Sequence, residues 1–312
     1  MSFITAAAHP ELFDKNIREV TERAEKEMWE KYNTLEMLYG IKGTDRAYEK
    51  FASVTDSPDI VPWDGKVEYL PRYNGYDYTV QPKIHGGGTQ YERELFDTKQ
   101  FSVMDDRAAN LARSTARYID KVAIEPLSLA FSATNGSFMT SEEGVALCGS
   151  HGNKTGYPTT LGFTNYGTAA LTPANVQAAI IAYNYLRSDI GERIYPEADC
   201  IFYPTNLKFR VEEIFGTEKG LDNAEGNLNV LGPRGSANMK RMEIPRLGDS
   251  STTNWFIGNY AEMKKMLLWM WLVKPEYDST VDFETKSFKT SVYTQFGWLF
   301  RGWRWVYGSM VS

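Results

Sequence analysis

Residues 281–308 read VDFETKSFKTSVYTQFGWLFRGWRWVYG, and this stretch says more about the fold than any other part of the chain. Val, Thr, Tyr, Phe and Trp favour a pleated, half-buried surface. The stretch therefore predicts a long strand, a turn at Gly302 and then a short aromatic strand. It does not gather the nucleophiles, bases or metal ligands of a catalytic site, so it points to architecture rather than chemistry.

The composition narrows the class of protein. The 312 residues are 42% hydrophobic and 14% aromatic, which fits either a large aromatic core or an aromatic interface. A net charge of −6 argues against a surface that binds nucleic acid non-specifically, although not against a protein that encloses it. Two cysteines make no disulfide framework, and we see neither a signal peptide nor a membrane span. We expect a soluble protein made in a reducing compartment.

The first long periodic segment predicts an amphipathic helix over residues 10–32. Its apolar stripe must be buried somewhere, either on a partner surface or on the chain's own domain, and the sequence leaves both open. The stripe repeats at spacings of three and four residues: Phe13, Ile17, Val20, Ala24 and Met28.

Residues 38–88 are broken repeatedly by Gly and Pro and predict a long hairpin that reaches away from the core. The β-like pieces are residues 66–70 and 76–83. In the second, Tyr76, Tyr78 and Val80 alternate with polar residues, as in a strand with one buried face. The three glycines after His85 suit a flexible hinge at the base of this hairpin.

Residues 101–124 predict the longest helix, since apolar positions recur over roughly six turns before Pro126 ends it. Further along, Thr172 is expected to cap a helix that extends to residue 186. A third helix is expected over residues 206–215, and residues 220–238 are expected to form a mobile loop. Short strands are predicted at residues 199–203, 239–244, 255–257 and 266–271. Without regular βαβ alternation, the fold class is α+β.

Two strings could carry chemistry. His85 and the glycines after it match the oxyanion-hole string of some hydrolases, but the chain lacks the Gly-x-Ser-x-Gly elbow that this reading needs. Cys148 and His151 could supply half of a metal site or a catalytic pair, but no second close pair of ligands completes it. We predict no catalytic, cofactor or metal site and no enzymatic activity.

The order of elements resembles the major capsid proteins of tailed bacteriophages with the Hong Kong 97-type fold, in particular the Mu-type head subunits. Residues 105–130 look like the family's spine helix. Residues 144–151 look like its strand and turn, although Cys148 stands where the family has an aromatic residue. The remaining strings match the axial domain and its close: residues 171–187, Gly191, 198–204, 255–259, 275–276 and 283–308.

The resemblance implies a subunit of four parts. Residues 1–36 would be an N-terminal arm and 37–92 an extended loop that lies over a neighbour. Residues 93–168 and 277–312 would form the peripheral domain, and 169–276 the axial domain. Symmetric neighbours could then cover the apolar residues of the arm and loop. The expected inter-subunit contact residues are Phe13, Ile17, Val20, Trp63, Tyr76, Tyr78 and Val80.

The implied function is mechanical. The subunits would form pentamers and hexamers of an icosahedral head that encloses double-stranded DNA without sequence-specific binding. Expected partners are other copies of the chain, a separate scaffolding protein, a portal and a decoration protein, with no membrane. The protein would reside in the virion, after assembly in the host cytoplasm. The alternatives are an encapsulin-like nanocompartment shell, which the long loop disfavours, and a hydrolase using the His85 glycine string.

Overall fold

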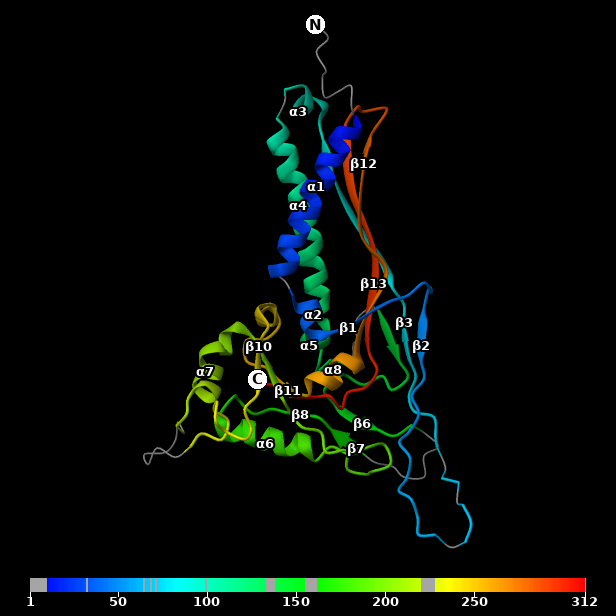
Figure 1. The fold of residues 1–312 in the computed structure, drawn as a ribbon, viewed down its shortest axis with the longest axis vertical. Helices are drawn as coiled ribbons and strands as arrows, with labels where there is room; N and C mark the ends of the chain where they lie inside the picture. Colours follow the sequence, from blue (N-terminus) through cyan, green and yellow to red (C-terminus); the bar gives the residue numbers. More distant parts are fainter. Residues whose placement is uncertain are drawn as a thin grey trace.

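The computed structural model describes residues 10–31, 33–63, 65–67, 69–70, 72–98, 100–132, 138–154, 162–219 and 228–311. Figure 1 shows an elongated molecule with a tall upper part and a wider base. A four-stranded sheet and two long helices form the upper part. A five-stranded sheet with shorter helices forms a lower lobe on one side, and a thin hairpin projects from the other.

The four-stranded sheet has the order β1-β12-β13-β4. Its centre is a long antiparallel hairpin of β12 (Leu267–Val281) and β13 (Phe288–Phe300), which we call the long hairpin. The edge strands are β4 (Lys83–Tyr91), antiparallel to β13, and β1 (Gly40–Gly43), parallel to β12. Register shifts between Trp271 and Glu276 mark bulges that bend β12.

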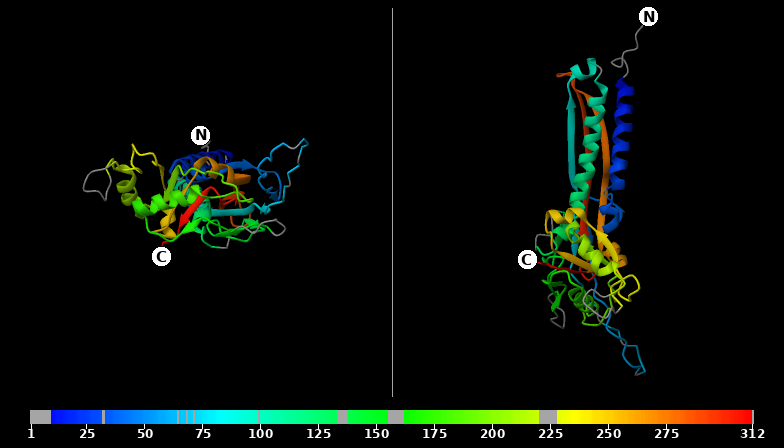
Figure 2. Two further views of the ribbon diagram at one scale, coloured as in Figure 1. Left: turned by 90° about the horizontal axis from the view of Figure 1, so that it is seen from below. Right: turned by 90° about the vertical axis from the view of Figure 1, so that its left-hand side faces the viewer.

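Two long helices, α1 (Pro10–Lys31) and α4 (Phe101–Ala123), pack together and run the length of this sheet, as both views in Figure 2 show. Both confirm the helices predicted from periodicity, and α4 ends three residues before Pro126. The buried face of α4 is broader than the predicted stripe, because α1 covers one flank and the sheet another. Ala112 and Ile119 are therefore fully buried, whereas Tyr118 on the predicted stripe is 41% exposed. The short helices beside them are α2 (Thr34–Leu38), α3 (Arg93–Asp97) and α5 (Glu125–Ser128).

The lower lobe is built on a sheet of order β10-β9-β11-β14-β8. Thr172 caps helix α6 as predicted, since its side chain accepts a hydrogen bond from the Asn175 backbone N–H at 3.3 Å. The strands are β8 (Tyr166–Gly167), β9 (Cys200–Tyr203), β10 (Lys240–Glu243), β11 (Trp255–Gly258) and β14 (Val306–Ser309). The helices are α6 (Pro173–Asn184), α7 (Lys208–Gly216) and α8 (Tyr260–Met266), with 3₁₀ turns at Thr205–Leu207 and Pro245–Asp249.

The thin projection is the extended hairpin, residues 49–80, closed at its base by β2 (Glu49–Phe51) and β3 (Tyr78–Val80). β3 also pairs with β5 (Met139–Ser141), which ties the hairpin to the body. Beyond an isolated bridge between Val54 and Asn74, no strand pairing supports the described residues of the tip. A separate two-stranded sheet, β6 (Ser150–Gly152) with β7 (Gly162–Thr164), lies near the base.

The structure differs from several sequence predictions. The strand expected from Val281 begins only at Phe288, because the residues between them turn the long hairpin. The final aromatic strand, β14, leaves the upper sheet and joins the lower lobe. Gly86, Gly87 and Gly88 lie inside β4 and pair with β13, so they form no hinge. The described residues of the 66–70 piece carry no strand, and residues 220–227 of the expected loop lie outside the described residues.

One aromatic core links the upper sheet to the lower lobe. Its largest fully buried members include Trp255, Trp269, Trp298 and Trp305. Rings of β12 and β13 contact one another directly, since Trp269 stacks on Phe296 with centroids 4.8 Å apart. The aromatic residues of β12 and β13 are therefore largely core residues.

Candidate assembly surfaces

The amphipathic face of α1 packs on the chain's own α4. Val20 lies against a small cluster of Ala24, Ala109 and Ala112, with Tyr277 of β12 at its edge. Val20 is only half-buried. Of the two possibilities that the sequence left open, the structure shows the packing of α1 within its own subunit. The side chains of Phe13 and Ile17 lie outside the described residues.

The expected contact residues of β3 are already buried within the subunit. Tyr78 is 5% exposed and Val80 is fully buried, because β3 lies between β2 and β5 and packs on β13. The same alternating pattern suits a strand that faces its own core, so the period-two signal could not separate these cases. These two side chains have almost no surface left for a neighbour, which corrects their assignment as contact residues.

Trp63 has the opposite environment. It is 72% exposed near the tip of the extended hairpin. Ile60 and Tyr69 are 91% and 90% exposed on the same segment. Contiguous exposed apolar side chains usually mark a surface that another macromolecule covers. The sequence signal for Ile60 and Tyr69 was present in the Gly- and Pro-rich stretch, but only the structure shows that the body does not cover them.

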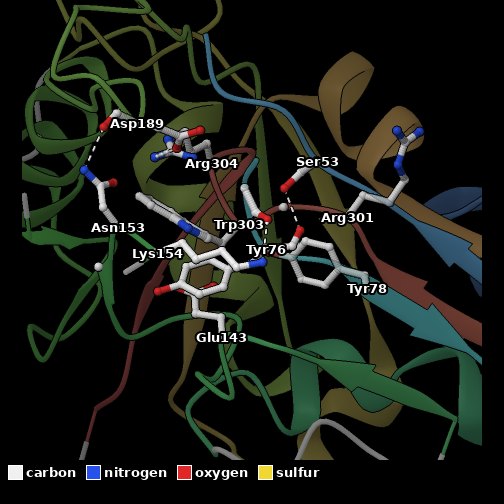
Figure 3. Close-up of a pocket in the computed structure, with 13 residues that line it drawn as sticks. Ser53, Tyr76, Tyr78, Glu143, Asn153, Lys154, Asp189, Arg301, Trp303 and Arg304 are labelled. Atoms are coloured by element: carbon white, nitrogen blue, oxygen red, sulfur yellow. Dashed lines mark hydrogen bonds and ion pairs between the residues drawn. The ribbon is translucent and has the colours of Figure 1, made fainter. Parts of the chain in front are cut away.

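A small polar cavity of about 80 Å³ lies where the extended hairpin joins the body (Figure 3). Lys154 is the main link: its Nζ donates to the Gly75 carbonyl at 3.3 Å and pairs with Glu142 at 2.6 Å. This pairing lowers the pKa of Glu142. The Ser53 hydroxyl donates to the Tyr76 carbonyl across the two arms of the hairpin. Tyr76, half-buried, therefore serves the anchor of the hairpin.

The body side of this cavity is held by stacked rings and ion pairs. The His151 ring lies on Trp303 with centroids 4.2 Å apart, and Arg304 covers the other part of Trp303 at 4.4 Å. Arg304 also pairs with Asp189 at 2.6 Å. Figure 3 shows Trp303 and Arg304 close to the hairpin residues Ser53 and Tyr76. The base of the hairpin is thus fixed to a rigid support, while its tip is exposed.

The two strings that could have carried chemistry do not form such sites. The Nδ1 atom of His151 bonds to Glu143 at 2.8 Å, a partner that the sequence reading missed because the two are not at a metal-ligand spacing. Cys148 is buried, and burial raises the pKa of its thiol far above the ordinary value, so the reactive thiolate is disfavoured. The backbone of His85 and its glycines is engaged in the β4–β13 ladder rather than in an oxyanion hole.

Within the part of the chain that the structure describes, no three His, Cys, Asp or Glu residues are grouped as metal ligands. None of the described helices is long and apolar enough to cross a membrane.

The comparisons with known proteins agree with this architecture. A family model described as phage capsid protein matches residues 76–309, well over half of the chain. The chain belongs to the phage capsid protein family. It is a structural protein of the phage head, with the Hong Kong 97-type fold of major capsid proteins.

Solved capsid structures share the fold at very low sequence identity. The cyanophage Pam1 capsid subunit is 12% identical, with a TM-score of 0.54 over 86% of this chain and 87% of that one. The capsid of a native GTA particle is 10% identical, with a TM-score of 0.53 over 90% of each chain. A chain from Microbacterium phage Oxtober96 is 8% identical, with a TM-score of 0.52 over 89% of this chain and 90% of that one. No curated protein sequence matches the chain significantly.

Proposed function

We propose that this capsid protein assembles into pentamers and hexamers that close an icosahedral head around double-stranded DNA. The observation that carries the proposal is the extended hairpin: its base is fixed to the body, while its apolar tip has no cover within the described subunit. Identical neighbours related by symmetry can provide that cover. Trp63, Ile60 and Tyr69 are the contact residues, in place of Tyr78 and Val80.

The charge of the chain supports a container rather than a DNA-binding protein. Each contact between a cationic side chain and a phosphate adds salt-dependent affinity for DNA. A net charge of −6 makes such contacts few over the whole surface. A wall that retains DNA by closure needs no such affinity, and DNA can still move during packaging and release.

The four-part division of the subunit is part of the proposal, with two revised boundaries. Residues 1–36 form the arm and 37–92 the extended loop. Because β12 runs continuously from Leu267, the peripheral part takes up all of that strand. Because β14 pairs with β11 and β8, residues 306–309 belong to the axial part. The axial part comprises the lower lobe, which would lie toward the five-fold and six-fold axes.

We include a separate scaffolding protein, a portal and a decoration protein as partners, with assembly in the host cytoplasm. The Mu-type subgroup also stays a prediction. Production of the chain alone tests the scaffold: uniform closed shells of native size, formed without any second protein, would contradict it.

Negative-stain electron microscopy of the purified protein, alone and co-produced with its phage's other head proteins, tests the main proposal. We expect rings, tubes or closed shells. Protease digestion of the same samples tests the role of the hairpin. Cleavage between Ile60 and Tyr69 should be rapid in free subunits and slow in shells. A monodisperse monomer under every condition would overturn the assembly proposal, and equal cleavage in both states would remove the hairpin from the interface.

A further inference from the structure

Helix α6 of the lower lobe is apolar on both faces. Val176, Ala179 and Tyr183 are buried against the lobe's own sheet. On the outer face, Ile181 is 57% exposed, and Tyr185, directly after the helix, is 56% exposed. A helix that is apolar all round is normally buried all round. The outer face of α6 is therefore a surface that the isolated subunit leaves uncovered.

The turn after α6 extends this surface and holds it rigid. The Arg193 guanidinium lies over the Tyr185 ring at 4.6 Å. The turn closes on itself, because the Ser188 N–H donates to the Glu192 carbonyl at 2.7 Å. Tyr195 is 72% exposed with a φ of 46°, a left-handed conformation that is costly for a bulky residue. Such strain is found where function requires a fixed side chain. We call Ile181, Tyr185, Ile194 and Tyr195 the α6 surface.

A second apolar feature lies on α7. Its Val211, Ile214 and Phe215 are buried, whereas Phe209 near its start is 80% exposed. The cation beside it, Lys208, is paired with Glu243 at 2.7 Å, which leaves the ring as the projecting feature. Figure 1 shows α7 along the upper-left margin of the lobe and α6 along its lower margin. The two features thus face away from each other.

We propose that the α6 surface of one copy receives Phe209 of the next copy around a closed ring. Two different surfaces on opposite margins of one subunit make a head-to-tail contact, and such contacts close into rings when the rotation fits. A single exposed aromatic ring meeting a preformed aromatic surface is typical of residues that dominate interface energy. This inference rests on the proposed function, and it names the two surfaces that join neighbours within a capsomer.

Cross-linking with one copy of each cysteine decides the arrangement. Ile181→Cys and Phe209→Cys both replace exposed residues, and the native Cys148 and Cys200 are buried. A short bis-maleimide is preferable to oxidation, because a disulfide demands a narrow range of Cβ geometry that a contact need not provide. We expect assembled Ile181→Cys/Phe209→Cys protein to give a ladder of covalent multimers that ends at the ring size. A mixture of the two single variants should give dimers only.

Matched controls separate this from chance collision. The pair Phe209→Cys with Val281→Cys, at the far end of the long hairpin, should give no ladder under the same conditions. Phe209→Leu should preserve assembly, whereas Phe209→Asp should reduce the yield of closed particles at least tenfold without loss of folded subunit. Dimers formed by Phe209→Cys alone would mean a symmetric contact and would overturn the proposal.

The same samples distinguish the two levels of the argument. If electron microscopy shows no closed particles from the unsubstituted protein, the proposed function fails, and this inference fails with it. If closed particles form but the double variant gives no ladder, or Phe209→Asp assembles as well as Phe209→Leu, the shell stands. In that case the α6–α7 contact is wrong.

Discussion

The long hairpin and the extended hairpin use the same kinds of side chain in opposite ways. In the long hairpin, Trp269 and Trp298 are almost fully buried beneath α1, α4 and the lower lobe. In the extended hairpin, Trp63 and Tyr69 are mostly exposed. The long hairpin has partners along both edges, whereas the tip of the extended hairpin has a single bridge. Aromatic content therefore does not separate a core from an interface; the strand partners do.

Trp298→Ala should break the more stable region and have the largest effect. The residue is 1% exposed, and its Nε1 donates to Glu125 at 2.9 Å. Removal of a buried Trp side chain costs about 3–5 kcal/mol. We expect a loss of this size in the free energy of unfolding of the free subunit, measured by urea denaturation. A loss below about 1 kcal/mol would show that the core around β13 is not packed as described.

Leu111→Pro should be nearly as damaging, because α4 supports the long hairpin along its length. Proline inside a helix removes a backbone hydrogen bond and clashes with the preceding turn, at a cost of about 3 kcal/mol or more. Leu111 is itself only half-buried, so Leu111→Ala is the matched control and should cost clearly less. Circular dichroism and soluble yield report the result, and equal values for the two variants would contradict the role of α4.

How much of this could be read from the sequence depended on whether the signal was local. The bounds of α1, α4 and α6 followed from periodicity, Pro126 and the Thr172 cap, all of which act within a few residues. The sequence did not show that residues 306–309 cross to the other sheet, because pairing with β11 is a contact between distant segments. Gly86 and its neighbours read as a hinge for the same reason: their partner strand lies some two hundred positions later.

The surfaces divided along the same line. Trp63 was found because aromatic residues among Gly and Pro have no local core. Tyr78 and Val80 were misassigned, because alternation reports that one face is covered but not by what. Glu143, His151 and Trp303 were missed as the support of the hairpin, since only the fold brings residues 143–151 onto residue 303.

Gly75→Ala tests the anchor between the two regions. An added Cβ would lie 2.2 Å from the Ser53 hydroxyl, which would have to rotate away from the Tyr76 carbonyl. The loss of one such hydrogen bond costs about 1 kcal/mol. We expect a loss of that order and faster amide exchange at the base of the extended hairpin. Gly87→Ala is the control, since nothing lies within 4 Å of its added Cβ; an equal effect of both would remove the anchor.

Glu125→Gln addresses the polar bond inside the long hairpin's core. Burial raises the pKa of Glu125, although the Trp298 N–H partly opposes this. A carboxyl with a raised pKa in the folded state favours folding while protonated, and this contribution is lost as pH rises through the folded pKa. Gln accepts the same hydrogen bond without a charge. The variant should therefore match the parent at low pH and become slightly more stable than it at neutral pH, by thermal unfolding; a constant difference across pH would contradict this.

Trp63→Ala should have the smallest effect on the free subunit and is the sharpest test of the comparison. A surface substitution away from the core changes the free energy of unfolding by less than about 0.5 kcal/mol. In the assembled shell the same change removes an aromatic contact with a neighbour, and such contacts are the residues on which interfaces depend. We expect unchanged urea unfolding of the subunit but shells that dissociate at lower denaturant. Trp63→Phe should restore most of the shell stability, because it keeps a ring at the contact. If shells of Trp63→Ala were as stable as the parent, the tip of the extended hairpin would be exposed in the shell as well, and its apolar residues would need another partner.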